Sequence, residues 1–279
     1  MVRTISEKFK SDVKYIFAKK ILMLSYIHWS VNPEIFPGFL PVRWYGLLFA
    51  AAFFFGYLVL IRIFRHEKLP VSLLDQLALY VFIATIIGAR LGHVMFYEPA
   101  YFLSDPLSVF KIWQGGLASH GAAIGILIAI WLFSRKNKKS YFWVLDRLVI
   151  VVALGGFFIR MGNLMNSEIY GHVTTLPWGF IFTSEDEMPR HPTQIYEGLS
   201  YLAIFAYLLW YYWHKDGKPK PGFIFGMFLI LLFAVRFLIE FVKEPQVTFE
   251  TNMALNMGQL LSLPFIIAGL VIVFRKNAK

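Results

Sequence analysis

Cysteine is absent from this 279-residue chain. The chain can therefore form no disulfide, bind no metal through thiolates and use no thiol of its own as a nucleophile. A Gly-x-Ser-x-Gly turn, which would indicate a serine hydrolase, is also missing from the sequence. His93, His172 and His191 have no histidine or carboxylate partner at i, i+4 on the same helix face, so we expect neither a metal site nor a cofactor.

Charged residues are scarce as well. They make up 16% of the chain, against 58% hydrophobic residues, whereas soluble proteins contain about 25% charged and about 45–50% apolar residues. This imbalance predicts a membrane protein that crosses the bilayer several times. The net charge of +10 is then explained by cytoplasmic loops, which are enriched in Lys and Arg, and we expect no nucleic-acid partner.

Apolar residues occur in runs, most of which match the ~20 residues that a helix needs to cross the hydrocarbon. Seven such segments occur, at residues 44–64, 73–97, 117–133, 144–163, 194–213, 223–242 and 257–274. We therefore expect an all-α integral membrane protein with about seven transmembrane helices in a single domain of residues 44–274. Residues 164–193 of this domain should form a small extracytoplasmic head.

Residues 1–43 have a different pattern. Lysines alternate with short apolar runs within residues 1–30, which indicates an amphipathic helix at the membrane interface rather than a spanning helix or a signal peptide. Pro33, Pro37 and Pro41 then interrupt any helix before the first apolar segment. We expect residues 1–43 to form an interfacial arm and a loop.

Basic residues cluster after the first, third, fifth and seventh apolar segments. These residues are Arg62, Arg65, Lys68, Arg135, Lys136, Lys138, Lys139, Lys215, Lys218, Lys220, Arg275, Lys276 and Lys279. Because Lys and Arg are retained on the cytoplasmic side, the pattern predicts that the first segment begins outside and that the tail at residues 275–279 is cytoplasmic. The basic residues of the arm would then lie outside, against the same rule.

The fourth apolar segment ends in a cluster of polar residues. Residues 148–159 carry no charge, and Arg160, Asn163, Asn166 and Glu168 then precede Gly171. A charged side chain within a spanning helix costs roughly 2.5–3.5 kcal/mol on insertion scales. A single arginine would suggest a helix end that reaches the interface, but the four polar residues together favour a binding site that faces the protein interior or a wet cavity.

Polar residues of all seven segments should lie in the outer leaflet if this topology is correct. These residues are Tyr45, Arg90, His120, Arg160, Asn163, Gln194, Glu197, Arg236, Glu240 and Gln259. Three arginines in one leaflet predict a site for an anionic lipid headgroup. A polytopic transporter for an anionic or lipid substrate is the alternative, but it would spread polar groups through the bilayer depth and show an internal repeat.

His120 lies among small residues, in Gly115-Gly116-Leu117-Ala118-Ser119-His120-Gly121. One interpretation is a histidine that packs through a hydrogen bond. The other is a general base, because the glycines would admit a substrate beside an imidazole, which can accept a proton near neutral pH. We favour the second interpretation.

Arg236 and Glu240 are four residues apart in an apolar helix. They form either an ion pair that only neutralises itself or a phosphate-binding guanidinium that a carboxylate holds in position. The two interpretations are compatible with each other.

Several of these motifs follow one another as in a known family. They are Arg43-Trp44-Tyr45-Gly46, Gly88-Ala89-Arg90, Gly115-Gly116 through His120-Gly121, Arg160 through Gly171, Arg190-His191-Pro192 through Tyr196-Glu197, Arg236 through Glu240 to Pro245, and Met257-Gly258-Gln259. The series covers nearly the whole chain from Trp44 and resembles the bacterial prolipoprotein diacylglyceryl transferases.

This resemblance implies an activity and its partners. The expected reaction transfers the sn-1,2-diacylglyceryl group of phosphatidylglycerol to the lipobox cysteine in the signal peptide of a prolipoprotein, and it releases glycerol phosphate. The expected location is the bacterial inner membrane, in contact with its lipid bilayer, with the active site on the extracytoplasmic side. The lack of cysteine fits a substrate that supplies its own thiol.

The resemblance also suggests roles for single residues. His120 would be the general base, Tyr45 and Asn163 would orient lipid or thiol, and Arg160 and Arg236 would bind the headgroup, with Glu240 beside Arg236. Further residues of the substrate site would be Arg90, Asn166, Glu168, Gly171, Gln194 and Gln259. Among these, Arg90 is the one for which we favour a structural role, and Glu168 would support the turn beside Gly171.

Overall fold

The computed structural model describes residues 26–38, 40–111, 116, 118–245 and 253–275. Nearly all of the predicted interfacial arm and of the cytoplasmic tail lies outside these described residues. The chain divides into two compact units. Unit 1 holds the described parts of residues 1–52, 154–204 and 231–267, and unit 2 holds those of 53–153, 205–230 and 268–279. Each unit is described by itself.

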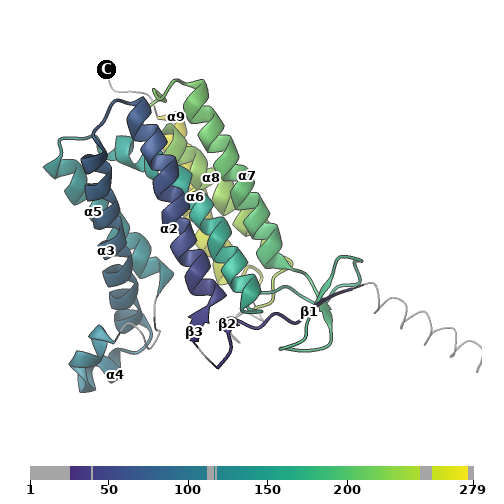
Figure 1. The fold of residues 1–279 in the computed structure, drawn as a ribbon. Coiled ribbons are helices and arrows are strands. Elements are labelled where there is room, and N and C mark those ends of the chain that lie inside the picture. The colour runs from purple at the N-terminus through teal and green to yellow at the C-terminus, as the bar shows by residue number, and fades with distance from the viewer. Residues whose placement is uncertain (1–25, 39, 112–115, 117, 246–252, 276–279) are drawn as a thin grey trace, which may run out of the picture. The chain divides into compact units, whose positions relative to one another are not determined.

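All seven predicted apolar segments are helices (Figure 1). They are α2 (Trp44–His66), α3 (Val71–Phe96), α5 (Ser119–Lys136), α6 (Tyr141–Met165), α7 (Thr193–His214), α8 (Phe223–Ile239) and α9 (Met257–Phe274). Four of them, α2, α3, α6 and α9, are long and apolar enough to cross a membrane, and α8 is a shorter apolar helix. The membrane-protein class is thus supported, whereas the number of spans and the sides of the termini stay predictions.

The apolar pattern did not predict every element. Helix α4 (Pro99–Ser104) and the 3-10 helix η1 (Pro106–Phe110) follow α3, and a proline occupies the first turn of each, where its missing N–H costs no hydrogen bond. Five short strands are also present: β1 (Ile27–Trp29), β2 (Glu34–Phe36), β3 (Leu40–Arg43), β4 (Phe180–Phe182) and β5 (Pro189–Arg190). The all-α expectation is therefore correct for the apolar segments and incomplete for the loops.

The head of unit 1 is a small sheet with its own core. Strand β4 pairs in parallel with β1 and antiparallel with β5. Leu164, Phe180 and Phe182 are buried there, and Trp29 packs against them. The indole Nε1 of Trp29 also donates a 2.9 Å hydrogen bond to the carbonyl oxygen of Leu164. The segment before α2 thus stabilises the end of α6, where the predicted site begins.

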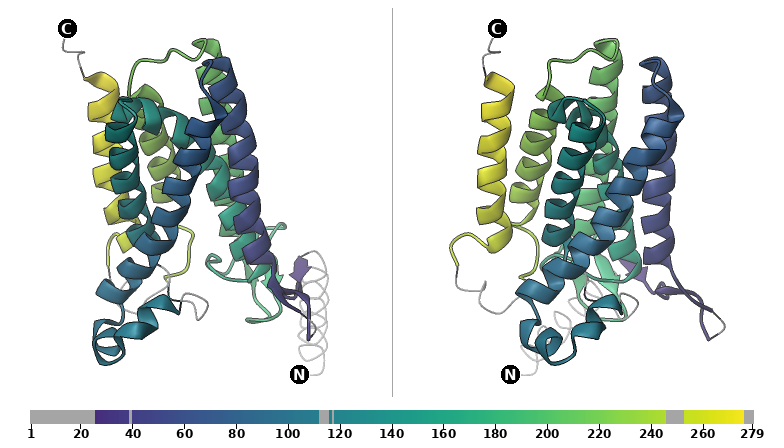
Figure 2. Two further views of the ribbon diagram at one scale, coloured as in Figure 1. Left: turned by 60° about the vertical axis from the view of Figure 1, so that its left-hand side comes forward. Right: turned by 90° about the vertical axis from the view of Figure 1, so that its left-hand side faces the viewer.

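The β2–β3 hairpin leads directly into α2, as Figure 2 shows for the purple part of the ribbon. The backbone N–H of Trp44, the first helical residue, donates a 3.0 Å hydrogen bond to the carbonyl oxygen of Pro33. One of the N–H groups that a helix start leaves unpaired is thereby satisfied. The hairpin fixes the position at which Tyr45 enters the first turn of α2.

In unit 2, α3 and α5 pack along a seam of glycines, and Figures 1 and 2 show them side by side. A Cβ atom added at Gly92 would lie 2.7 Å from the Cα of Gly121, and one added at Gly125 would lie 2.6 Å from the carbonyl oxygen of Ala84. Small residues permit such close backbone contact between membrane helices. Gly121 and Gly125, which follow His120, thus have a packing function.

A network of hydrogen bonds in unit 2 connects α2, α6 and α7. The carboxylate of Glu67 accepts hydrogen bonds from Arg147 Nε at 2.9 Å, from Tyr212 Oη at 2.7 Å and from Trp143 Nε1 at 3.1 Å. Nearby, Asp146 accepts hydrogen bonds from the backbone N–H groups of Gly222 and Phe225 and so caps the start of α8.

Candidate active site

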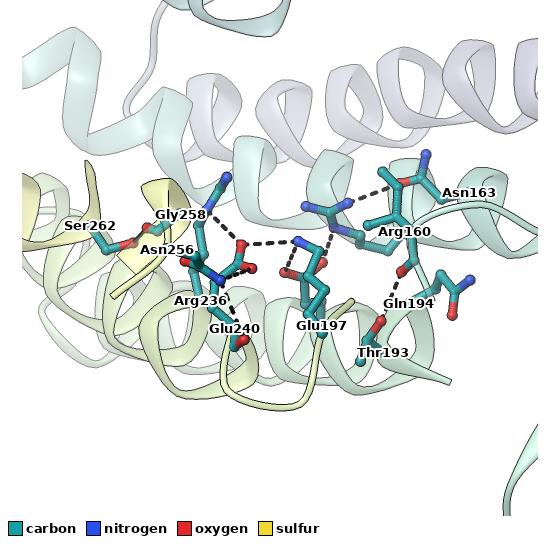
Figure 3. A network of polar contacts seen from close by, with 12 residues as sticks. Arg160, Asn163, Thr193, Gln194, Glu197, Arg236, Glu240, Asn256, Gly258 and Ser262 are labelled. Carbon is teal, nitrogen blue, oxygen red and sulfur yellow. Dashed lines mark hydrogen bonds and ion pairs between the residues drawn. The ribbon is translucent and has the colours of Figure 1, made fainter. Parts of the chain in front are cut away.

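Arg160 of α6 and Glu197 of α7 form the centre of a polar network in unit 1 (Figure 3). Nε of Arg160 forms an ion pair with Oε2 of Glu197, and its Nη1 donates a 3.1 Å hydrogen bond to Oδ1 of Asn163. Gly198 follows Glu197 and packs against α6, because a Cβ there would lie 3.5 Å from Cβ of Arg160. Arg160 therefore faces the protein interior, as the sequence predicted.

The predicted cluster after Arg160 forms a closed turn. Helix α6 ends at Met165, and Oε1 of Glu168 then accepts hydrogen bonds from Asn163 Nδ2 at 2.7 Å and from Asn166 Nδ2 at 3.3 Å. Nε2 of Gln194 donates a 2.7 Å hydrogen bond to the carbonyl oxygen of Glu168. The four polar residues thus hold one another, which explains why they occur together in the sequence.

Gly171 lies where three backbone segments meet. Its N–H donates a 2.9 Å hydrogen bond to the carbonyl oxygen of His191, and it forms an antiparallel bridge with Lys243. A Cβ at this position would lie 2.7 Å from Cβ of His191 and 2.8 Å from Cγ2 of Thr193. Glycine is therefore required for backbone packing, and its surroundings leave no space for a ligand beside the α-carbon.

A second carboxylate, that of Glu240, continues the network beyond Glu197. Helix α8 ends at Ile239 rather than at residue 242 as predicted, so Glu240 begins a turn. Nζ of Lys243 lies 3.1 Å from Oε1 of Glu240 and 3.6 Å from Oε1 of Glu197. Sequence analysis missed Lys243. Its signal was a cation three residues after Glu240 in an otherwise apolar stretch.

Arg236 and Glu240 interact more weakly than their i, i+4 spacing suggested. Nε of Arg236 lies 3.8 Å from Oε1 of Glu240, beyond hydrogen-bond distance. This nitrogen is buried and has no hydrogen-bond partner among the described residues, although 36% of the Arg236 side chain is exposed. The guanidinium is therefore less committed to the carboxylate than an intrahelical pair would be.

The start of α9 completes the surroundings of Glu240. Asn256 and Gln259 form a capping box, because each side-chain oxygen accepts a hydrogen bond from the backbone N–H of the other residue, at 2.9 and 3.1 Å. Nδ2 of Asn256 donates to Oε2 of Glu240 at 3.2 Å, and a Cβ at Gly258 would lie 2.5 Å from Cδ of Glu240. Gln259, predicted as a substrate ligand, thus has a structural function, although its Nε2 is buried without a partner among the described residues.

Tyr45 belongs to the same unit and packs on helix α6. A Cβ at Gly162 would lie 2.8 Å from Cδ2 of Tyr45, so the missing side chain of Gly162 makes space for the phenol ring. The close approach at Gly162 is therefore made by an aromatic side chain.

The charges alternate along this network. The row runs from Arg236 through Glu240, Lys243 and Glu197 to Arg160, with an arginine at each end. Figure 3 labels the two arginines and the two carboxylates. Three cations face two carboxylates within the row, and a third carboxylate, that of Glu168, lies beyond Arg160 and Asn163. The guanidinium groups at the two ends of the row can donate hydrogen bonds to an anion.

Two more buried polar atoms lie beside the row without a hydrogen-bond partner among the described residues: Oδ1 of Asn166 and Oε1 of Gln194. Such atoms are costly to bury unless they gain a partner. They are consistent with a site that binds a polar group. Among the described residues, no cluster of three His, Asp or Glu side chains could hold a metal ion.

Arg190 connects the head to the segment after α8. It forms ion pairs with Asp186 and Glu244, and its guanidinium lies 4.8 Å from the ring centroid of Tyr170. The hydrogen bond from Arg190 lowers the pKa of Asp186 below its usual value of 3.8. For the neighbouring His191, burial and then the nearby His172 lower the pKa below 6.5.

Arg90 and His120 belong to unit 2. The guanidinium of Arg90 donates to the carbonyl oxygens of Ser108, Val109 and Gly116 at 2.7, 2.9 and 3.2 Å, which favours the structural role over headgroup binding. His120 is exposed, and its ring lies 5.2 Å from that of Phe96. The backbone of α3 occupies the space beside the neighbouring Gly121. This glycine therefore does not make space for a substrate, contrary to the expectation from the sequence.

Comparisons with known proteins agree in one respect. The model of a family described as prolipoprotein diacylglyceryl transferase matches residues 33–275. A relative from Tolumonas auensis is 49% identical over 249 residues, 88% of this chain and 96% of the relative. Relatives from Porphyromonas gingivalis and Chloroherpeton thalassium are 48% and 44% identical and cover 90% of this chain and 95% and 94% of their own. Each of the three is named phosphatidylglycerol–prolipoprotein diacylglyceryl transferase.

Proposed function

Since this chain belongs to the prolipoprotein diacylglyceryl transferase family, we propose that its row of buried charges binds the phosphate of phosphatidylglycerol during the transfer. The activity is that of the family: a diacylglyceryl group moves from phosphatidylglycerol to a prolipoprotein in lipoprotein maturation. The acceptor is the lipobox cysteine of the prolipoprotein signal peptide. The bacterial inner membrane is the site of the reaction, and the charged row lies toward its extracytoplasmic side.

The transfer replaces one bond to carbon by another. The thiol sulfur bonds to the glyceryl carbon that carries the phosphate, the carbon–oxygen bond at that carbon breaks, and glycerol phosphate leaves with the bonding electrons. The thiol must also lose its proton, because a cysteine with a pKa of about 8.5 is mostly protonated at neutral pH. The enzyme thus has to stabilise negative charge on the leaving phosphate and to accept a proton.

Arg160 and Arg236 are the headgroup ligands in this proposal. The observation that carries it is the alternating row, in which an arginine stands at each end and Nε of Arg236 lies 3.8 Å from its carboxylate, beyond hydrogen-bond distance. A planar guanidinium can donate two parallel hydrogen bonds to phosphate oxygens. Asn166 and Gln194, with their buried oxygens lacking partners among the described residues, line the same site and bind the hydroxyl groups of the glycerol.

His120 is our candidate for the general base, with Tyr45 and Asn163 as residues that orient the lipid or the thiol. Imidazole is the side chain suited to accept a proton near neutral pH, whereas a phenol and an amide are poor bases there. Glu240 is less suitable, because it already accepts from Lys243 and Asn256. The exposed imidazole is accessible to a thiol that enters from the membrane surface.

An alkylation assay tests this proposal. Purified protein is mixed with phosphatidylglycerol and a lipobox peptide, and thioether formation and glycerol phosphate release are measured together. Parent protein should alkylate the peptide, whereas the rates of Arg160→Lys and Arg236→Lys should each fall at least tenfold, about 1.4 kcal/mol in activation free energy. Lysine keeps the positive charge but cannot donate the two parallel hydrogen bonds of a guanidinium. Full activity in both variants would refute the assignment of the headgroup ligands.

The proton acceptor is tested in the same assay across pH. His120→Gln should turn over more slowly and lose the acidic limb of the parent pH profile. A peptide with serine in place of cysteine is the negative control. If His120→Gln keeps the parent rate and the same acidic limb, His120 is a packing residue and another group accepts the proton.

A further inference from the structure

We propose that Lys243 is a positioning residue of this active site: it joins the carboxylates of Glu197 and Glu240 and thereby sets the positions of Arg160 and Arg236. The inference rests on the proposed function of the two arginines. It adds a residue of the motif from Arg236 to Pro245 to which sequence analysis assigned no function. In this proposal, the two buried carboxylates hold the two arginines in position.

The geometry around the ammonium group carries the inference. Nζ of Lys243 lies 3.1 Å from Oε1 of Glu240 and 3.6 Å from Oε1 of Glu197. The side chain of Lys243 is 5% exposed, and those of Glu197 and Glu240 are 0% and 8% exposed. A buried lysine is costly unless it is paired, and here one cation neutralises two carboxylates at once.

Each carboxylate has other neighbours, and none of them can replace Lys243. Glu197 faces Arg160 and the hydroxyl of Tyr201, which itself is hydrogen-bonded to Arg160. Glu240 faces Asn256, which is neutral, and Arg236 at 3.8 Å. Without the ammonium group, the two buried carboxylates would lose the cation that joins them and would repel each other.

Backbone contacts with residues 170–172, in the segment after α6, hold Lys243 in place. Residue 243 forms an antiparallel bridge with Gly171, the N–H of His172 donates a 2.9 Å hydrogen bond to Val242, and the N–H of Glu244 donates to Tyr170 at 3.3 Å. Lys243 therefore cannot move away without breaking this ladder. A change in the turn after α6 is transmitted through it to Glu240.

The consequence for catalysis follows from the order of charges. Arg160 and Arg236 each have a carboxylate partner in the row, and both carboxylates must be ionised to hold them. Loss of Lys243 should leave two neighbouring carboxylates without the cation that joins them, so that their repulsion displaces the guanidinium groups that they hold. The lipid site would then bind its headgroup more weakly.

The test compares the KM for phosphatidylglycerol and the kcat of lipobox peptide alkylation in the parent, Lys243→Met and Lys243→Arg. The KM of Lys243→Met should rise at least tenfold, by more than its kcat falls. Lys243→Arg should restore the parent KM, because it restores the cation. The matched control is Lys218→Met, an exposed lysine of unit 2, which should leave KM and kcat unchanged.

A charge-balanced variant separates positioning from folding. Glu240→Gln combined with Lys243→Met removes one carboxylate together with the cation, so its KM should rise less than that of Lys243→Met even if the maximal rate is lower. An unchanged KM in Lys243→Met, or the same rise in the double variant, would overturn the proposal, as would a loss confined to kcat. If Lys243→Met yields no folded protein, the double variant alone decides. A parent that fails to alkylate the peptide would instead refute the proposed function.

Discussion

The carboxylate of Glu197 is completely buried, and its Oε2 forms an ion pair with Nε of Arg160 on the neighbouring helix. Removal of one partner from a buried ion pair leaves the other charge without compensation in the protein interior. The pair therefore has consequences for stability that are separate from those for catalysis.

Glu197→Gln should lower the free energy of unfolding by about 3–5 kcal/mol, because Arg160 and Lys243 both lose a charged partner. Thermal unfolding in detergent measures this effect. Glu187→Gln on the exposed surface of the head is the control and should unfold like the parent. An unchanged melting temperature in Glu197→Gln would show that the pair adds nothing to stability.

Gly171→Ala should destabilise the fold by about 1–3 kcal/mol, the usual cost of overpacking, because the added methyl group would overlap with His191 and Thr193. Gly46→Ala provides the contrast: nothing lies within 4 Å of its Cβ position, and it lies in helix α2. Alanine there should be neutral or stabilising. Equal melting temperatures for the two variants would contradict the close approach of the backbone at Gly171.

The stability of the head should fall as the pH decreases below about 6.5. Burial and the neighbouring His172 lower the pKa of folded His191, so the unfolded chain binds a proton in a pH range in which the folded chain does not. Stability is then fully present above 6.5 and is lost toward acidic pH. Melting temperatures at pH 8 and pH 5.5 should differ less in His191→Gln than in the parent, whereas the exposed His28→Gln should keep the parental difference.

A single cysteine can report topology, because the parent has none. Ser184 is exposed on the head, and Ser184→Cys should react with a membrane-impermeant thiol reagent in intact cells whose outer barrier is permeable to it. Labelling that occurs only after lysis would place the head, and with it the site, on the cytoplasmic side. A cysteine at Lys276, in the predicted cytoplasmic tail, should show the opposite behaviour.

The helices and the polar signature could be predicted from sequence for a simple physical reason. Apolar runs of about 20 residues have few alternatives to a spanning helix, and polar groups within them are costly enough to require partners. Arg160, Asn163 and Glu168 were therefore recognisable as a cluster before their contacts were known. These residues lie within one helical end and the turn after it, so their spacing can be read directly from the sequence.

Contacts between distant segments were not predictable in the same way. Lys243 resembles any cation at a helix end, and only the fold brings it to Glu197. Strands of three residues, such as β1 and β4, are too short to show an alternating pattern. A glycine in a sequence likewise does not reveal what fills the space beside it: Gly121 was attributed to a substrate, and the backbone of α3 lies there.

The bridge between Gly171 and Lys243 joins a part of the chain that is synthesised early to one that is synthesised late. The turn after α6 leaves the ribosome before α7 and α8 exist, and the capping box of Asn256 and Gln259 follows later still. Until these segments arrive, Arg160 has neither Glu197 beside it nor Lys243 to complete the row. Nascent chains that stop before Lys243 therefore lack the complete row of charges, and the proposed lipid site can form only after α7 and the residues up to Lys243 have joined α6.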